Sequence, residues 1–249
     1  MQPSKIKPWL RVGYISPHPL VDTLPYEFYL MAPPGVMMMA ACIEIEDYTL
    51  EAVEKQLEIL NDRIDSLMKR GAGRIVISGV PIALALGRPR MKDLLARISA
   101  RWGVVADTDL EAIIAGAISL GAHRVGLATR WKTAMNERLA AYLGEAGLEV
   151  VDIASSGRSM AENAGLDDET GIALAKKLGG QVLSSPGAPD ALIMPGGRWI
   201  TVEPVRELEE RFDRPVITNY AAGLWAALRN ERHATPILGW GKLLASLGD

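Results

Sequence analysis

The stretch Ala191-Leu-Ile-Met-Pro-Gly-Gly-Arg-Trp199 decides the fold that we expect for this chain. Its four apolar residues end abruptly in Pro195-Gly196-Gly197, and an acidic, helix-compatible segment follows from Val202. This order predicts a buried strand, a tight loop and a helix. In open α/β sheets, ligands bind at the carboxyl ends of the strands, where two glycines let backbone N–H groups approach an anion. The same residues are also compatible with a plain turn.

A second loop of the same kind, Ile77-Ser-Gly-Val-Pro81, follows another apolar run. Strand-like and helix-like segments alternate along the chain, which favours parallel sheets. The predicted strands are residues 11–16, 36–43, 74–78, 104–105, 124–128, 148–153, 191–194 and 214–218. The predicted helices are residues 49–70, 90–102, 108–121, 134–146, 169–178, 202–212 and 221–229. We expect the Pro-rich segment 17–35 to form an irregular flap over a cleft.

The order of these elements repeats along the chain. Residues 11–16 and their loop match residues 124–128 and theirs, and residues 74–78 match residues 191–194 in the same way. Two similar α/β halves that face each other bring four strand-end loops around one cleft.

Composition excludes several classes of function. The 249 residues suffice for one large domain or two small ones, and 49% of them are hydrophobic. A net charge of -3, without a basic stripe, argues against a nucleic-acid partner. The apolar runs fall short of the roughly 20 residues that a membrane helix needs. The first residues lack the apolar core of a signal peptide, so we expect a cytoplasmic protein.

The single cysteine, Cys42, excludes an intrachain disulfide and a cysteine metal site. It lies in a predicted strand, where we expect a core residue. The sequence contains no phosphate-binding loop, no dinucleotide fingerprint, no paired-histidine pattern and no nucleophile elbow. We therefore expect neither a metal nor a cofactor.

The chain resembles the aspartate/glutamate racemase superfamily, and within it the arylmalonate decarboxylase and maleate isomerase branch. The segments that carry the resemblance occur in the family's order along nearly the whole chain: Arg11-Val-Gly-Tyr-Ile-Ser-Pro17, Leu120-Gly-Ala-His-Arg-Val-Gly-Leu-Ala-Thr129, Asn136-Glu-Arg-Leu-Ala-Ala-Tyr-Leu143, Gly196-Gly197, Arg214-Pro-Val-Ile-Thr218 and Ala222-Gly-Leu-Trp225.

This resemblance implies an α/β fold of two flavodoxin-like parallel-sheet halves related by a pseudo-twofold axis. A small carboxylate then binds in an active site between the halves. We expect residues 1–107 with 220–249 to form the first half and residues 108–219 to form the second. The sequence is compatible with a homo-oligomer and leaves the oligomeric state open.

The chain departs from the family at the positions of the catalytic and carboxylate-binding residues. Isomerases and racemases of the superfamily place a cysteine in each half, and the decarboxylase keeps the second cysteine as its proton donor. Here the matching positions hold Gly79 and Pro195. The hydroxyl side chains that help to hold a carboxylate in the decarboxylase are replaced by Val80 and Pro81, and a tyrosine is replaced by Trp131. We therefore do not expect a thiol-based two-base racemisation.

His18 is the best remaining acid or base, because histidine titrates near neutral pH and this one follows the first predicted strand between two prolines. Asp22 and Glu27 in the same segment are alternatives, and a loop histidine without a role is the plainer interpretation. Arg130 and Arg198 follow two of the cleft loops, where a guanidinium can pair with a carboxylate. The predicted substrate-binding residues are Ser16, Ser78, Gly79, Val80, Trp131, Pro195, Gly196, Gly197, Arg198 and Tyr220.

Backbone N–H groups at Gly79–Val80 and Gly196–Gly197 are the part of the family site that this sequence preserves best. We also expect Trp131, Tyr26, Phe28 and Tyr29 to form an aromatic wall of the pocket.

We interpret the chain as a cofactor-independent lyase of the decarboxylase type, or an isomerase, that acts on a small carboxylate through a non-cysteine acid or base. Stabilising an enolate needs fewer proton-transfer groups than racemisation does, which favours the lyase. The alternatives are a hydrolase of a small cyclic amide or lactone, and a non-catalytic carboxylate-binding protein of the same fold.

Overall fold

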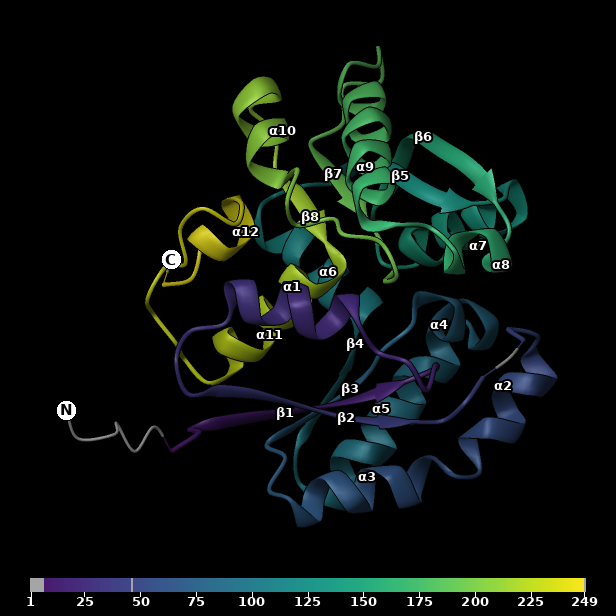
Figure 1. Ribbon diagram of the computed structural model, residues 1–249, viewed down its shortest axis with the longest axis vertical. Coiled ribbons are helices and arrows are strands. Elements are labelled where there is room, and N and C mark those ends of the chain that lie inside the picture. Colours follow the sequence, from purple (N-terminus) through teal and green to yellow (C-terminus); the bar gives the residue numbers. More distant parts are fainter. Residues whose placement is uncertain (1–6, 46, 249) are drawn as a thin grey trace.

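Two four-stranded parallel sheets form the frame of the protein (Figure 1). The computed structural model describes residues 7–45 and 47–248. The first sheet has the order β2-β1-β3-β4 and the second the order β6-β5-β7-β8. The strands are β1 (Leu10–Ser16), β2 (Val36–Cys42), β3 (Arg74–Ile77), β4 (Val105–Thr108), β5 (Arg124–Trp131), β6 (Glu149–Arg158), β7 (Ala191–Met194) and β8 (Val216–Thr218).

The second sheet repeats the order of the first with every strand number raised by four. All of the strand pairs are parallel. Two of the inner strands, β3 and β7, are buried at every residue, as expected for strands with both faces covered. The predicted α/β class with two parallel-sheet halves is confirmed, whereas the proposed boundaries near residues 107 and 220 stay a prediction.

Helices cover both sheets and fill the space between them (Figure 1). They are α1 (Thr23–Met31), α2 (Leu50–Leu57), α3 (Leu60–Lys69), α4 (Val80–Leu86), α5 (Arg88–Trp102), α6 (Asp109–Ser119), α7 (Thr133–Gly144), α8 (Met160–Ala164), α9 (Asp168–Leu183), α10 (Val205–Phe212), α11 (Asn219–Asn230) and α12 (Lys242–Ala245). α3 and α5 pack on the first sheet, α7, α9 and α10 pack on the second, and α6 packs against α11.

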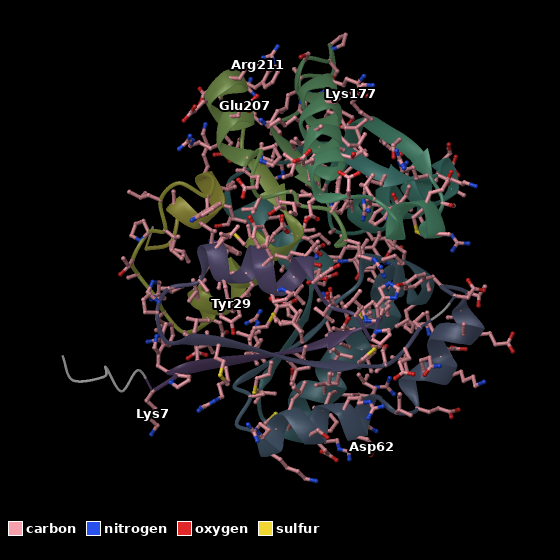
Figure 2. The ribbon with its side chains drawn as sticks, in the orientation of Figure 1. Lys7, Tyr29, Asp62, Lys177, Glu207 and Arg211 are labelled. Carbon is pink, nitrogen blue, oxygen red and sulfur yellow. The ribbon has the colours of Figure 1, made fainter. Side chains whose placement is uncertain are left out.

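The outer helix faces are charged, as Lys177, Glu207 and Arg211 show on α9 and α10 (Figure 2). None of the helices in the described part of the chain has the length and apolar character needed to span a membrane.

The predicted irregular flap is wrong, because residues 23–31 form the helix α1. The Asp22 carboxylate accepts a hydrogen bond from the Thr23 N–H and begins the helix. Pro25 occupies the first turn, where the missing N–H would have had no partner within the helix.

The single helix predicted for residues 49–70 is two helices, α2 and α3, separated at Glu58 and Ile59. The two pieces pack on different neighbours, α2 on α4 and α3 on β1 and β2. Helix α4 was not predicted, because its consecutive residues Ile82, Ala83 and Leu84 are all buried and show no helical period. The five-residue α8 was not predicted either, because it is too short for a periodic pattern.

Cys42 is not a core residue as predicted, but half-buried at the end of the edge strand β2. Its Sγ accepts a hydrogen bond from the Glu44 N–H over 3.2 Å.

Helix α1 ties the N-terminal part of the chain to the segment after β7. Glu27, which has no exposed surface, accepts hydrogen bonds from the N–H groups of Thr201 and Val202, the latter over 2.8 Å. The preceding residue, Tyr26, donates through its hydroxyl to Glu203 over 3.2 Å. Burial raises the pKa of Glu27 to about 7, although the two backbone N–H groups act in the opposite direction.

This raised pKa predicts a pH-dependent stability. Between the ordinary pKa of 4.5 and about 7, folded Glu27 holds a proton that the unfolded chain has lost, so the free energy of unfolding falls as pH rises. In Glu27→Gln, which keeps the accepting oxygen without the charge, this fall should shrink. In Glu27→Ala, the unpaired N–H groups should lower stability at every pH by about 1–3 kcal/mol.

Denaturant unfolding at several pH values measures both effects. Glu137→Gln, which changes an exposed carboxylate on α7, far from Glu27 in the sequence, is the control and should leave the pH profile unchanged. Equal pH slopes for the wild type and Glu27→Gln would contradict this account.

Candidate active site

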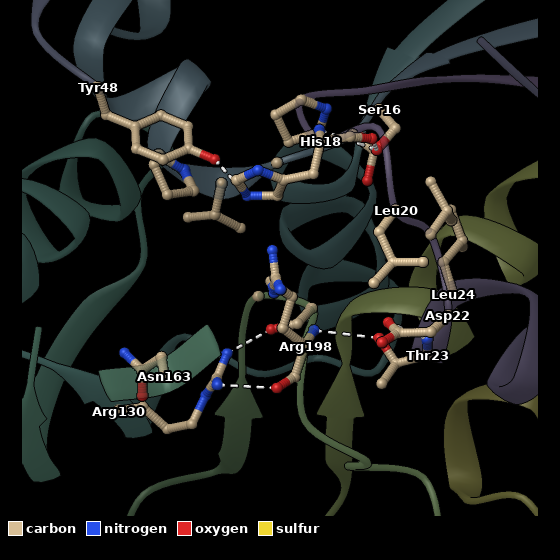
Figure 3. A pocket seen from close by; sticks show the side chains of 18 of the residues that line it. Ser16, His18, Leu20, Asp22, Thr23, Leu24, Tyr48, Arg130, Asn163 and Arg198 are labelled. Atoms are coloured by element: carbon tan, nitrogen blue, oxygen red, sulfur yellow. Dashed lines mark hydrogen bonds between the residues drawn. The ribbon is translucent and has the colours of Figure 1, made fainter. Parts of the chain in front are cut away.

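A cavity of about 310 Å³ lies where the end of β5 meets the loops after β1, β3 and β7 (Figure 3). Tyr48, Tyr220, Ala161 and Asn163 also line it. His18 and all of the predicted substrate-binding residues line this cavity except Pro195, whereas Glu27, the alternative base, does not. Pro195 directly follows β7 and is buried, and it is absent from the cavity wall. The binding roles of the residues that do line the cavity stay a prediction.

His18 is held by a tight turn after β1. Its backbone N–H donates to the Ser16 Oγ over 3.2 Å, and that hydroxyl donates to the His18 carbonyl over 3.0 Å. The imidazole Nε2 lies 2.9 Å from the Tyr48 hydroxyl (Figure 3). Burial, with the nearby Arg198 guanidinium, lowers the pKa of His18 below 6.5, so the free imidazole is neutral near pH 7.

Tyr48 was missed by the sequence analysis. Burial raises its pKa far above the ordinary value, so the phenol keeps its proton and is available as a hydrogen-bond donor to His18. The only signal in the sequence was its position shortly after the second predicted strand.

Arg198 is held in an unusual conformation by its neighbours. Its φ of 63° lies in the left-handed region, which non-glycine residues seldom adopt. Its N–H donates to the Thr23 Oγ1 of α1 over 3.1 Å, which fixes the backbone while the side chain lines the cavity (Figure 3). Its guanidinium forms no ion pair with any carboxylate in residues 7–45 and 47–248.

Arg130 is nearly inaccessible, with 4% of its surface exposed. Its guanidinium donates to the carbonyl of Arg198 over 2.9 Å and to the carbonyl of Gly197, and it lies 5.0 Å from the Trp199 ring centre. Burial lowers the pKa of Arg130 to about 10, which still leaves it charged at neutral pH. Arg130 therefore shapes the 197–198 loop and adds a second positive charge that no described carboxylate balances.

The predicted backbone anion cradle needs correction. The Gly79 N–H donates to the Asp109 carboxylate over 2.9 Å, and the Gly196 N–H donates to the Asn219 Oδ1 over 3.1 Å. These two donors are therefore already used. Val80 and Gly197 line the cavity, and their N–H groups have no partner among the described residues, so they are the two of the four predicted donors that remain for an anion.

The hydroxyls predicted to meet the substrate are also engaged. The Ser78 Oγ donates to Asp109 over 2.7 Å, and the Ser16 Oγ serves the turn that holds His18. The hydrogen bonds of both hydroxyls therefore hold the loops in place.

The predicted aromatic wall is wrong except for Trp131. Tyr26 and Tyr29 are exposed, and Phe28 is buried in the core, so none of these three lines the cavity. The apolar lining comes instead from Leu20, Val21, Leu24, Val80 and Pro81.

A family model described as arylmalonate decarboxylase matches residues 12–244. The chain belongs to this family. Arylmalonate decarboxylase from Bordetella bronchiseptica is 28% identical over 199 residues, which cover 79% of this chain and 80% of the relative.

Two solved structures have the same architecture. A crystal structure of arylmalonate decarboxylase superposes with a TM-score of 0.77 at 26% identity, covering 94% of this chain and 98% of the other. The maleate cis-trans isomerase of Nocardia farcinica superposes with a TM-score of 0.82 at 19% identity, covering 95% and 98%. The second likeness shows the fold alone. The resemblance noted in the sequence is thereby confirmed.

This family member has no thiol among the described residues of its cavity wall. Gly79 and Pro195 follow β3 and β7, and Cys42 lies outside the wall. Proton transfer in this cavity therefore falls to another group.

The glycine at position 197 is required by its contact with Tyr220. A Cβ built on Gly197 would lie 1.9 Å from the Tyr220 hydroxyl oxygen. Gly197→Ala should therefore displace the loop or the tyrosine and lower the melting temperature by several degrees. The double variant Gly197→Ala/Tyr220→Phe should recover much of the loss, because the clashing oxygen is gone.

Gly180→Ala is the control, since a Cβ there meets nothing within 4 Å. Additive losses in the double variant would show that this contact does not explain the glycine.

Proposed function

We propose that this chain is a cofactor-independent decarboxylase of small malonate-type dicarboxylates. The observation that carries the proposal is the pair of guanidinium groups, Arg130 and Arg198, that no described carboxylate balances. Buried charges are costly unless they are paired. Asp22 is the single carboxylate among the described residues of the wall, so the cavity is positive overall and suits a dianion. The family match and the decarboxylase relative support the same reaction.

In this reaction the bond between the α carbon and one carboxylate breaks, and carbon dioxide leaves. The electron pair passes into the remaining carboxylate as an enediolate, which a proton on the α carbon then converts to the product. Arg198 and the free N–H groups of Val80 and Gly197 are suited to hold the carboxylate on which negative charge grows. The apolar residues Leu20, Leu24 and Pro81 suit the departing carboxylate, which becomes neutral carbon dioxide.

His18 is the proposed proton donor. A bound dianion favours the imidazolium form and so offsets the burial that lowers its pKa in the free protein. The imidazolium gives its proton to the α carbon and is recharged from water after product release. Tyr48, through its contact with Nε2, orients the ring.

The test of the proposed function is release of carbon dioxide from phenylmalonate and methylmalonate. In Arg198→Met, kcat/KM should fall about 10²- to 10³-fold, because a charge that stabilises the enediolate is lost. Arg206→Met, which removes an exposed guanidinium on α10, is the control and should keep wild-type rates. Thermal stabilisation by malonates without carbon dioxide release would identify a non-catalytic binding protein instead.

The role of His18 predicts a pH profile. If the imidazolium donates the proton, kcat/KM should fall about tenfold for each unit by which the pH exceeds the pKa of His18, which lies below 6.5. His18→Gln should lose this slope and about 10²- to 10⁴-fold in rate. His123→Gln, at the start of β5, where the residue is exposed, should retain both. A sloping profile in His18→Gln would assign the proton to another residue.

A further inference from the structure

The side-chain amide of Asn163 lies in the cavity wall, and the proposed reaction gives this amide no role. The residue lies in the short helix α8 after β6, and only 3% of it is exposed. Figure 3 shows its side chain on the side of the cavity where Arg130 lies, away from His18 and Tyr48.

Neither the Nδ2 nor the Oδ1 of Asn163 has a hydrogen-bond partner among the described residues. An amide carries two donor hydrogens and an accepting oxygen, and burying these groups unpaired destabilises a protein. Arg130 does not serve them, because its guanidinium donates to two loop carbonyls.

The local fold does not need this amide. The Asn163 backbone N–H donates to the Ser159 carbonyl over 3.0 Å, as a helix requires. Helix α8 is fixed by a capping box, in which the Ser159 side chain and the Glu162 side chain each bond the other's backbone N–H. An apolar side chain at position 163 would leave all of these bonds in place, so the polar group is best explained by a ligand.

We propose that Asn163 is a specificity-determining residue that hydrogen-bonds a polar, uncharged substituent on the α carbon of the substrate. The inference rests on the proposed decarboxylase function. A carboxamide-bearing substituent suits the site best, since it offers one donor and one acceptor to the donor and acceptor of Asn163. A cationic substituent is disfavoured by Arg130, and a purely alkyl one leaves the buried amide unpaired.

A matched pair of substrates tests this inference. Carbamoylmethylmalonate and isobutylmalonate have nearly the same shape and differ in the polar amide, as do asparagine and leucine. The wild type should prefer carbamoylmethylmalonate in kcat/KM by at least about tenfold, and Asn163→Leu should reverse this preference. Methylmalonate, whose methyl group has no polar atom for the amide to bind, is the reference substrate to which both rates are normalised. Asn163→Ala, which removes the amide without filling its place, is a second variant and should abolish the preference.

Thermal melting separates specificity from a structural role. Asn163→Leu should melt at or above the wild-type temperature, because it replaces an unpaired buried amide with an apolar group. A lower melting temperature, with equal losses on all three substrates, would overturn the inference, as would a wild type without any preference.

If the proposed function is wrong, none of the malonates releases carbon dioxide. The shift in melting temperature with carbamoylmethylmalonate and with isobutylmalonate then tests the Asn163 contact by itself. A larger shift with carbamoylmethylmalonate in the wild type, lost in Asn163→Leu, supports the Asn163 contact, and equal shifts overturn it.

Discussion

The cavity depends on two buried polar side chains that stand at equivalent places in the two halves. Asp109 begins α6 after β4, and Asn219 begins α11 after β8. Asp109 accepts from the Gly79 N–H, and Asn219 accepts from the Gly196 N–H, so each anchors the loop that follows the neighbouring inner strand. Because α6 and α11 pack against each other, the two anchors fix both loops relative to one frame. Because the Gly79 and Gly196 N–H groups form these bonds, they hold the loops in place and are not available to a ligand.

Charge is the second constraint. Arg130 is held inside the protein by carbonyl oxygens and an aromatic face, and Arg198 is held with a positive φ by Thr23 of α1. Carbonyl oxygens orient a guanidinium but do not neutralise it, so the positive charge remains available to an anion. Glu27, on the next turn of α1, accepts a hydrogen bond from the Val202 N–H and so holds the segment after Arg198. The geometry of the cationic wall is thus set by a helix from the other end of the sequence.

In the proposed mechanism, a histidine takes the place of a thiol as the proton donor. Gly79 and Pro195 follow β3 and β7, whereas His18 follows β1 and contacts Tyr48. On this proposal, the imidazole, whose pKa is lowered by burial, is neutral when the cavity is empty and gains its proton when an anion enters. Substrate binding and acid activation are then coupled through charge.

Burial period, glycines and prolines are local properties of the sequence, and they predict the parallel α/β class, the repeated element order and the loops that end at the cavity. They also place His18 and Arg198 in loops that follow such strands.

Which donors stay free depends on the tertiary structure. Gly79 and Gly196 donate to residues about 30 and 23 positions away, a pairing that local pattern does not encode. Tyr48 and Asn163 likewise reach the cavity through the packing of α2 on α4 and the placement of α8, and the contacts of α1 with residues 198–203 fix where that helix lies. A sequence pattern gives the order of residue types along the chain, but it does not give the partners that each residue contacts. Long-range contacts of this kind therefore set the chemistry of the site.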